Sequence, residues 1–112
     1  MKVFESLKSL KSLRIQGIDV GTGALGKLKK ILVENPRSVL RVTIGGFSCS
    51  GPSLELALGM PGEGDRVEVV DGLELHVDAR VHVLMAGCRI HIDYNAQYKG
   101  FVLEAIGTVP GC

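Results

Sequence analysis

From residue 39 onward the sequence alternates apolar with polar side chains, with a period of two, in one short run after another. The runs cover residues 40–44, 54–58, 66–69, 73–78, 89–94 and 101–104. A period of two places the apolar side chains on one face of a strand and the polar ones on the other. This pattern predicts six or seven short, mostly antiparallel strands, each buried on one face. Asp71-Gly72, between two of the runs, favours a two-residue hairpin.

Residues 22–34 have a different period. Their apolar positions recur every three or four residues, which predicts an amphipathic helix whose lysines point to solvent. The stripe comprises Leu25, Leu28, Ile31 and Leu32. Asp19 or Thr22 is the expected N-cap, and Asn35-Pro36 is expected to end the helix. The predicted fold class is therefore β-rich α+β, with one N-terminal amphipathic helix followed by the strands in two packed layers.

The length and composition predict one folded domain. The chain has 112 residues, of which 46% are hydrophobic and 22% charged, as in ordinary globular proteins. We expect the domain to cover residues 17–112 and residues 1–16 to form an N-terminal extension. In the extension an apolar residue recurs every three positions, which fits a helical face loosely. These residues are Phe4, Leu7, Leu10 and Leu13.

Composition excludes several functional classes. No run approaches the 18 apolar residues of a membrane span, so no membrane partner is expected. Aromatic residues make up only 4%, which argues against a nucleic-acid partner that needs stacking platforms. The N-terminus lacks the apolar stretch of a secretory signal, which favours a cytoplasmic protein. Asp78 and Asp93 are candidate acids without a visible base, so the chain is not expected to be an enzyme.

Charge is unevenly distributed along the chain. Residues 1–41 contain nine Lys/Arg and three Asp/Glu, a charge of +6. Residues 42–112 contain four Lys/Arg and nine Asp/Glu, a charge of −5, and the two parts sum to the net +1. One interpretation is a solvated basic helix packed on an acidic sheet, and the other is a docking surface for an acidic partner.

The sequence contains three cysteines, Cys49, Cys88 and Cys112. In a protein that is not secreted, free thiols favour metal or redox chemistry over a disulfide framework. Cys49 lies in a glycine-rich connection, residues 45–52, where it is either a ligand or an idle thiol. Cys88 alternates with Ile90 and Ile92, which predicts a buried structural cysteine that is less suited to ligation.

The three histidines do not form a predicted metal site. His76, His82 and His91 lie on or beside predicted strands, and all three are expected at the surface. His91 is three residues after Cys88, so the two side chains should point to opposite faces of a sheet. No tight Cys/His spacing supports a zinc site.

A series of short motifs follows in order along the chain. Leu40-Arg41-Val42 leads to Gly46 and then to Cys49-Ser50-Gly51. The later pieces are Gly72 before Val77-Asp78, Gly87 before Ile90 and Ile92-Asp93-Tyr94, and Gly100-Phe101. The first piece resembles the first cysteine motif of the HesB/IscA-like family of A-type iron–sulfur carriers. The later pieces come in that family's order and extend the resemblance over residues 18–112.

The family's second cysteine motif is Cys-x-Cys near the C-terminus. Cys112, 63 residues after Cys49, is similar in position to the first cysteine of that pair. This sequence ends there, and Pro52-Ser53 departs from the family's residues after the first motif. Some relatives carry selenocysteine at a cysteine-motif position, so a selenoprotein-related branch is one interpretation of the ending.

The resemblance implies a HesB-like sandwich that carries an iron–sulfur cluster (2Fe–2S or 4Fe–4S) or iron on Cys49 and Cys112. Clusters are usually held by four cysteine sulfurs, and one chain offers two at motif positions, so two protomers would share a cluster. The implied partners are apo iron–sulfur proteins and cluster-assembly proteins. The alternative is a HesB-like domain without cluster competence, acting as a thiol-redox or protein-interaction module.

Overall fold

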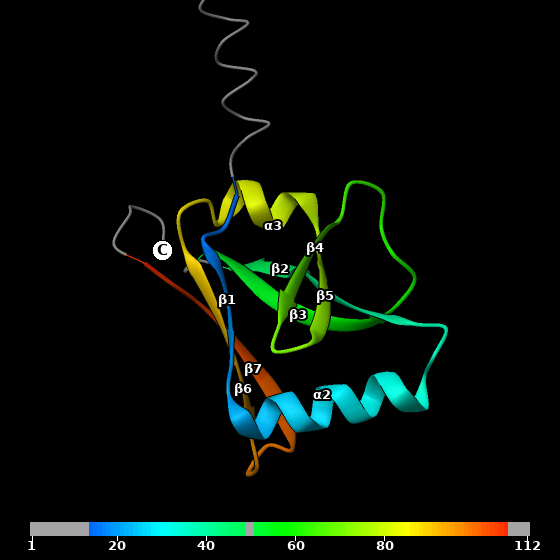
Figure 1. Cartoon of the computed structure of the whole chain (residues 1–112). Helices are drawn as coiled ribbons and strands as arrows, with labels where there is room; N and C mark the ends of the chain where they lie inside the picture. The colour runs from blue at the N-terminus through cyan, green and yellow to red at the C-terminus, as the bar shows by residue number, and fades with distance from the viewer. Residues whose placement is uncertain (1–13, 49–50, 108–112) are drawn as a thin grey trace, which may run out of the picture.

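The computed structural model describes residues 14–48 and 51–107, which form seven strands and two helices (Figure 1). The predicted helix and all six predicted strands are present. The elements are β1 (Gly17–Val20), α2 (Thr22–Glu34), β2 (Val39–Ser48), β3 (Gly51–Gly59), β4 (Arg66–Val70), β5 (Leu73–Val77), α3 (Ala79–Leu84), β6 (Arg89–Asn95) and β7 (Gly100–Ile106). Neither helix among these residues is long and apolar enough to span a bilayer.

The strands form two sheets. The smaller has the order β1-β6-β7, and the larger has the order β3-β2-β5-β4. The pairs β2–β3, β4–β5 and β6–β7 are antiparallel, as the short connections predict, whereas β1–β6 and β2–β5 are parallel. Asp71 and Gly72 both have positive φ, 50° and 83°, in the two-residue turn that joins β4 to β5. The predicted hairpin is therefore confirmed.

The prediction that a helix comes first and only strands follow is wrong in two places. A strand, β1, precedes α2, and its four residues are too few to show a period. They pair with β6, about 70 residues later in the chain, which no local pattern reveals. The second helix, α3, follows β5, in a segment where the sequence pattern predicts no element.

The ends of α2 confirm one expectation and correct another. Asn35 caps the C-terminus, where its side-chain amide donates to the Ile31 carbonyl over 2.8 Å. The N-cap is Gly21, with no side-chain capping bond, and neither Asp19 nor Thr22 fills that position. The Asp19 carboxylate instead accepts two hydrogen bonds from Arg89 of β6, which explains why it does not cap the helix.

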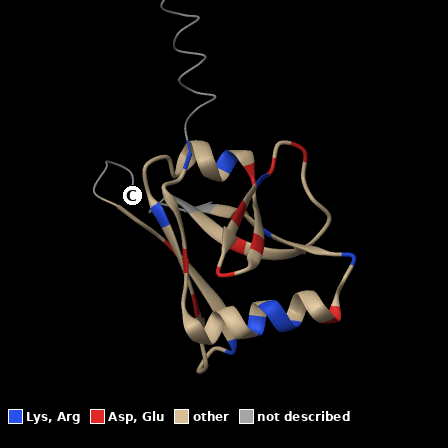
Figure 2. Ribbon diagram, viewed as in Figure 1, with Lys and Arg blue, Asp and Glu red and all other residues tan. Residues whose placement is uncertain are grey.

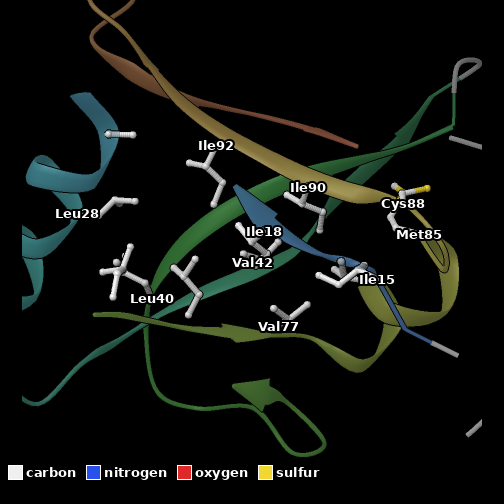
Figure 3. Packing of buried hydrophobic residues seen from close by; sticks show 14 residues of the cluster. Ile15, Ile18, Leu28, Leu40, Val42, Val77, Met85, Cys88, Ile90 and Ile92 are labelled. Atoms are coloured by element: carbon white, nitrogen blue, oxygen red, sulfur yellow. The ribbon is translucent and has the colours of Figure 1, made fainter. Parts of the chain in front are cut away.

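The core lies between the inner faces of the two sheets and the buried side of α2 (Figure 3). The larger sheet supplies Leu40, Val42, Leu73, Leu75 and Val77, and the smaller supplies Ile18, Ile90 and Ile92. Ala24 and Leu28 close the core from α2. Ile15, which the sequence placed in the extension, is also buried. The rest of the extension, residues 1–13, lies outside the described residues, and the boundary at residue 17 stays a prediction.

Candidate cysteine site

The segment that carries Cys49 joins two strands of the larger sheet. The ladder between β2 and β3 continues to the pair Ser48–Gly51, with a register irregularity between Ile44 and Gly46. Both flanks of the segment are therefore held by backbone pairing. Cys49 and Ser50 themselves lie outside the described residues.

The segment that carries Cys112 leaves the smaller sheet beside Cys88. Ile106, the last residue of β7, pairs with Arg89, the residue that follows Cys88. Gly107 is the last described residue, and Cys112 lies beyond it. Strand β3 contacts β7, and Figures 1 and 3 place the end of β7, the start of β6 and the end of β2 at one end of the molecule. We call this end, formed by the end of β2, the start of β6 and the end of β7, the cysteine end.

Cys88 is fully buried immediately before β6, and it belongs to the core cluster with Ile90 and Ile92. Its backbone N–H donates to the Met85 carbonyl over 3.0 Å, and its carbonyl accepts from Gln16 N over 2.8 Å. Its sulfur is disulfide-bonded, and Cys88 is the only cysteine among the described residues. The expectation that all three thiols are free is therefore wrong for this cysteine.

The described residues do not assemble a metal site by themselves. Among residues 14–48 and 51–107, no group of three His, Cys, Asp or Glu side chains lies close enough together to hold one ion. His91 contacts Asp93 on the outer face of β6, with 3.0 Å between Nε2 and Oδ2, whereas Cys88 faces the core. The predicted opposition of Cys88 and His91 is confirmed.

His82 is the polar residue whose position the sequence predicted wrongly. It lies on α3 and is only 2% exposed, because α3 is a helix that turns this side chain toward the core. Its Nδ1 accepts from the Ile15 N–H over 3.3 Å, and Nε2 has no partner among the described residues. Burial lowers the pKa of His82, and the positive charge of Arg66 adds to this effect. The ring is therefore a neutral link between α3 and the chain before β1.

An ion-pair network fixes the entry to α3. Arg41 of β2 donates from Nε and Nη2 to the two carboxylate oxygens of Asp65, both over 2.7 Å. Hydrogen bonds from Arg41 lower the pKa of Asp65 despite its burial. Asp78 caps α3 by accepting from Arg80 N over 2.8 Å, and its pKa is lowered chiefly by the Arg80 side chain. The candidate acid Asp78 is thus a structural cap.

The outer face of β6 and β7 contains an open hollow of about 510 Å³. Its polar lining includes His91, Asp93, Asn95, Gln97 and Glu104. Asp93, the other candidate acid, has a side chain that is 57% exposed and contacts the His91 ring. Figure 2 shows the lysines along α2 and acidic residues on the strands, an arrangement that fits both interpretations of the charge pattern.

Solved structures of three proteins resemble this one. The crystal structure of Escherichia coli SufA, involved in biosynthesis of iron–sulfur clusters, gives a TM-score of 0.68 at 16% identity over 90% of each chain. IscA with a 2Fe–2S cluster gives 0.57 at 18% identity, over 80% of this chain and 84% of that one. The solution NMR structure of a protein from Aquifex aeolicus gives 0.55 at 22% identity, over 81% and 93%.

The sequence matches no protein-family model and no curated protein. At the identities found, the structural likeness establishes the fold. The chain has the fold of SufA and IscA, as its ordered motifs predicted.

Proposed function

We propose that the chain is an A-type iron–sulfur cluster carrier, which receives iron or a cluster and passes it to apo-proteins. The observation that carries the proposal is the SufA- and IscA-like fold, whose cysteine end is where both predicted ligand segments begin. In this account the protein binds and transfers its cargo and is not an enzyme.

Cys49 and Cys112 are the proposed ligands. Residue 49 is flanked by the paired Ser48 and Gly51, so this segment leaves the sheet from a fixed position. The segment that ends in Cys112 begins at Gly107, next to the edge where Ile106 pairs with Arg89. Both segments therefore start from the same end of a rigid scaffold, as a shared ligand site requires.

The thiol count sets the stoichiometry. A 2Fe–2S or 4Fe–4S cluster is usually held by four cysteine sulfurs. Two chains supply four through Cys49 and Cys112, and Cys88 is buried within the core and is not needed. We therefore propose a homodimer that shares one cluster. Thiolates are the ligands, so loading requires reduced protein.

Cluster transfer tests this function. Reduced protein is loaded anaerobically with iron and sulfide, separated from free iron, and mixed with an apo-ferredoxin, and the visible circular dichroism of the holo-ferredoxin is followed. We expect transfer by the wild type and by Cys88→Ser, and none by Cys49→Ser or Cys112→Ser. A wild type that transfers no faster than free iron and sulfide would refute the carrier function.

The disulfide at Cys88 favours a second candidate function, a thiol-redox or interaction module without a cluster. In that case the reduced wild type stays colourless after reconstitution, and the oxidised wild type converts a dithiol substrate to its disulfide while its own Cys88 disulfide is reduced to two thiols. Cys88→Ser would abolish this exchange, whereas it leaves cluster transfer intact under the first proposal. The two functions therefore make opposite predictions for one variant.

The remaining assignments are part of the same proposal. We place the carrier domain at residues 17–112 and the extension at residues 1–16, in a cytoplasmic protein. The proposed partners are apo iron–sulfur proteins and the assembly proteins that supply the cluster. Limited proteolysis followed by mass spectrometry tests the boundary, because cleavage should concentrate before residue 17 and not within the carrier domain.

A further inference from the structure

Helix α3 has apolar side chains on its outer side as well as on its inner side, next to the charged Arg80. Val81, His82 and Met85 at its end are buried on the inner side. On the outer side Val83 is 47% exposed and Leu84 is 45% exposed. Together with Ala79 and Arg80 they line a shallow hollow of about 330 Å³, which we call the α3 patch. Two neighbouring apolar side chains on the outer side of the helix form a surface that another apolar segment can cover.

The described chain begins beside this helix. Ile15 is 2% exposed, and its N–H donates to His82 Nδ1 over 3.3 Å. The Arg14 carbonyl accepts from Gly87 N over 3.1 Å, in the turn that follows α3. Figure 1 shows the start of the described chain reaching α3 before it turns into β1. Thirteen residues, 1–13, precede this anchored point.

These thirteen residues have the pattern and length of a covering segment. Apolar residues recur at Phe4, Leu7, Leu10 and Leu13, with lysines and serines between them. As a helix, residues 4–13 would span about 15 Å, whereas the six residues of α3 span about 9 Å. A segment tethered to the same helix also has an effective concentration of order millimolar, without a partner in solution.

We infer that residues 1–13 pack across α3 with Leu7 and Leu10 against Val83 and Leu84. A second copy of the chain is a poorer occupant, because a stable dimer needs about 800 Å² and 20–30 residues from each partner. The α3 patch has four lining residues. The inference is independent of the proposed carrier function, since it involves none of the proposed ligands.

Methyl NOEs in the full chain test the contact without any substitution. A sample of uniformly labelled protein should show NOEs from Leu7 and Leu10 methyls to those of Val83 and Leu84. A second sample that mixes labelled and unlabelled chains separates contacts within one chain from contacts between chains. NOEs between chains at the α3 patch, or none from residues 1–13, would overturn the inference.

A pair of matched variants provides a second readout. Leu7→Asp with Leu10→Asp places two charges on the proposed contact face, and Ser9→Asp with Ser12→Asp places the same two charges away from it. We expect amide hydrogen exchange in α3 to become about tenfold faster in the leucine variant, the equivalent of about 1.4 kcal/mol, and to stay unchanged in the serine variant. Equal exchange rates in the two variants would refute the packing.

Discussion

The Arg41–Asp65 pair should contribute far more to stability than the similar pair between Arg89 and Asp19. The Asp65 side chain is only 3% exposed, and its carboxylate accepts from Arg41 twice and from Gly62 N over 2.8 Å. Asp65→Asn keeps the size of the side chain and removes its charge. The partly buried guanidinium then loses its closest counter-charge, since its other carboxylate partner, Asp78, lies 3.4 Å from Nη2.

Removing one partner of a fully buried ion pair costs about 3–5 kcal/mol. The Arg41 side chain is 22% exposed and still has Asp78 as a partner, so we expect Asp65→Asn to lower the free energy of unfolding by about 2–3 kcal/mol. For a domain of this size the melting temperature should fall by about 8–12 °C. Urea unfolding and calorimetry of the reduced protein measure both quantities.

Asp19→Asn is the matched control. Asp19 also accepts two hydrogen bonds from one arginine, over 2.7 and 2.9 Å, but its side chain is 51% exposed and that of Arg89 is 46% exposed. Exposed ion pairs contribute little to stability, so this variant should have the same melting temperature as the wild type. Equal losses in the two variants would refute the argument that burial decides the effect.

The same pair predicts a pH dependence. Its hydrogen bonds from Arg41 lower the pKa of Asp65 in the folded state below the unfolded value of about 3.9. Its contribution is therefore fully present above about pH 5 and is lost as the pH falls through the lowered pKa. The stability difference between wild type and Asp65→Asn should be constant from pH 5 to 7 and shrink below pH 4. A difference that grows on acidification would contradict this sign.

Three further predictions follow from single residues. Gly72 has φ +83°, so Gly72→Ala should destabilise the β4–β5 hairpin by about 1–2 kcal/mol. In α2 the added carbon of Gly23→Ala meets nothing within 4 Å, so this substitution should stabilise the protein by about 0.5–1 kcal/mol. Urea unfolding that gives both changes the same sign would be inconsistent with this argument from backbone conformation. Burial lowers the pKa of His82, so the unfolded chain binds an extra proton below about pH 6.5. The free energy of unfolding should therefore fall from pH 7 toward pH 5, and His82→Leu should reduce the slope of this dependence. An unchanged slope would exclude His82 as its source. In reduced protein Cys88→Ser buries a hydroxyl in the core, so it should lower the free energy of unfolding by about 1–3 kcal/mol without loss of the cluster. Loss of the cluster at an unchanged melting temperature would show that Cys88 is a ligand and not a structural residue.

Local periodicity predicted the elements that are long enough to show it. Helix α2 and the strands from β2 onward carry their own apolar pattern, and Asp71-Gly72 has the residue types that its positive φ values require. Strand β1 has four residues and exists because β6 pairs with it from far along the chain. Its pairing also directs Asp19 to Arg89, which is why the expected N-cap does not form.

The candidate site was only partly predictable for similar reasons. The strand phase placed Cys88 in the core and opposed it to His91, and both positions hold in the structure. The sequence pattern did not predict the helix α3, so His82 was assigned to the surface like the other histidines although it is buried. Cys49 and Cys112 lie outside the described residues, and their role as ligands stays a prediction.

Native mass spectrometry after anaerobic reconstitution tests the shared cluster most directly. Reduced wild type treated with iron and sulfide should give an ion of two chains plus one iron–sulfur cluster, with the matching iron and sulfide content. Cys88→Ser should give the same ion, and Cys49→Ser and Cys112→Ser should give chains without cluster. A wild type that remains a cluster-free single chain, or a cluster retained in Cys112→Ser and lost in Cys88→Ser, would contradict the account.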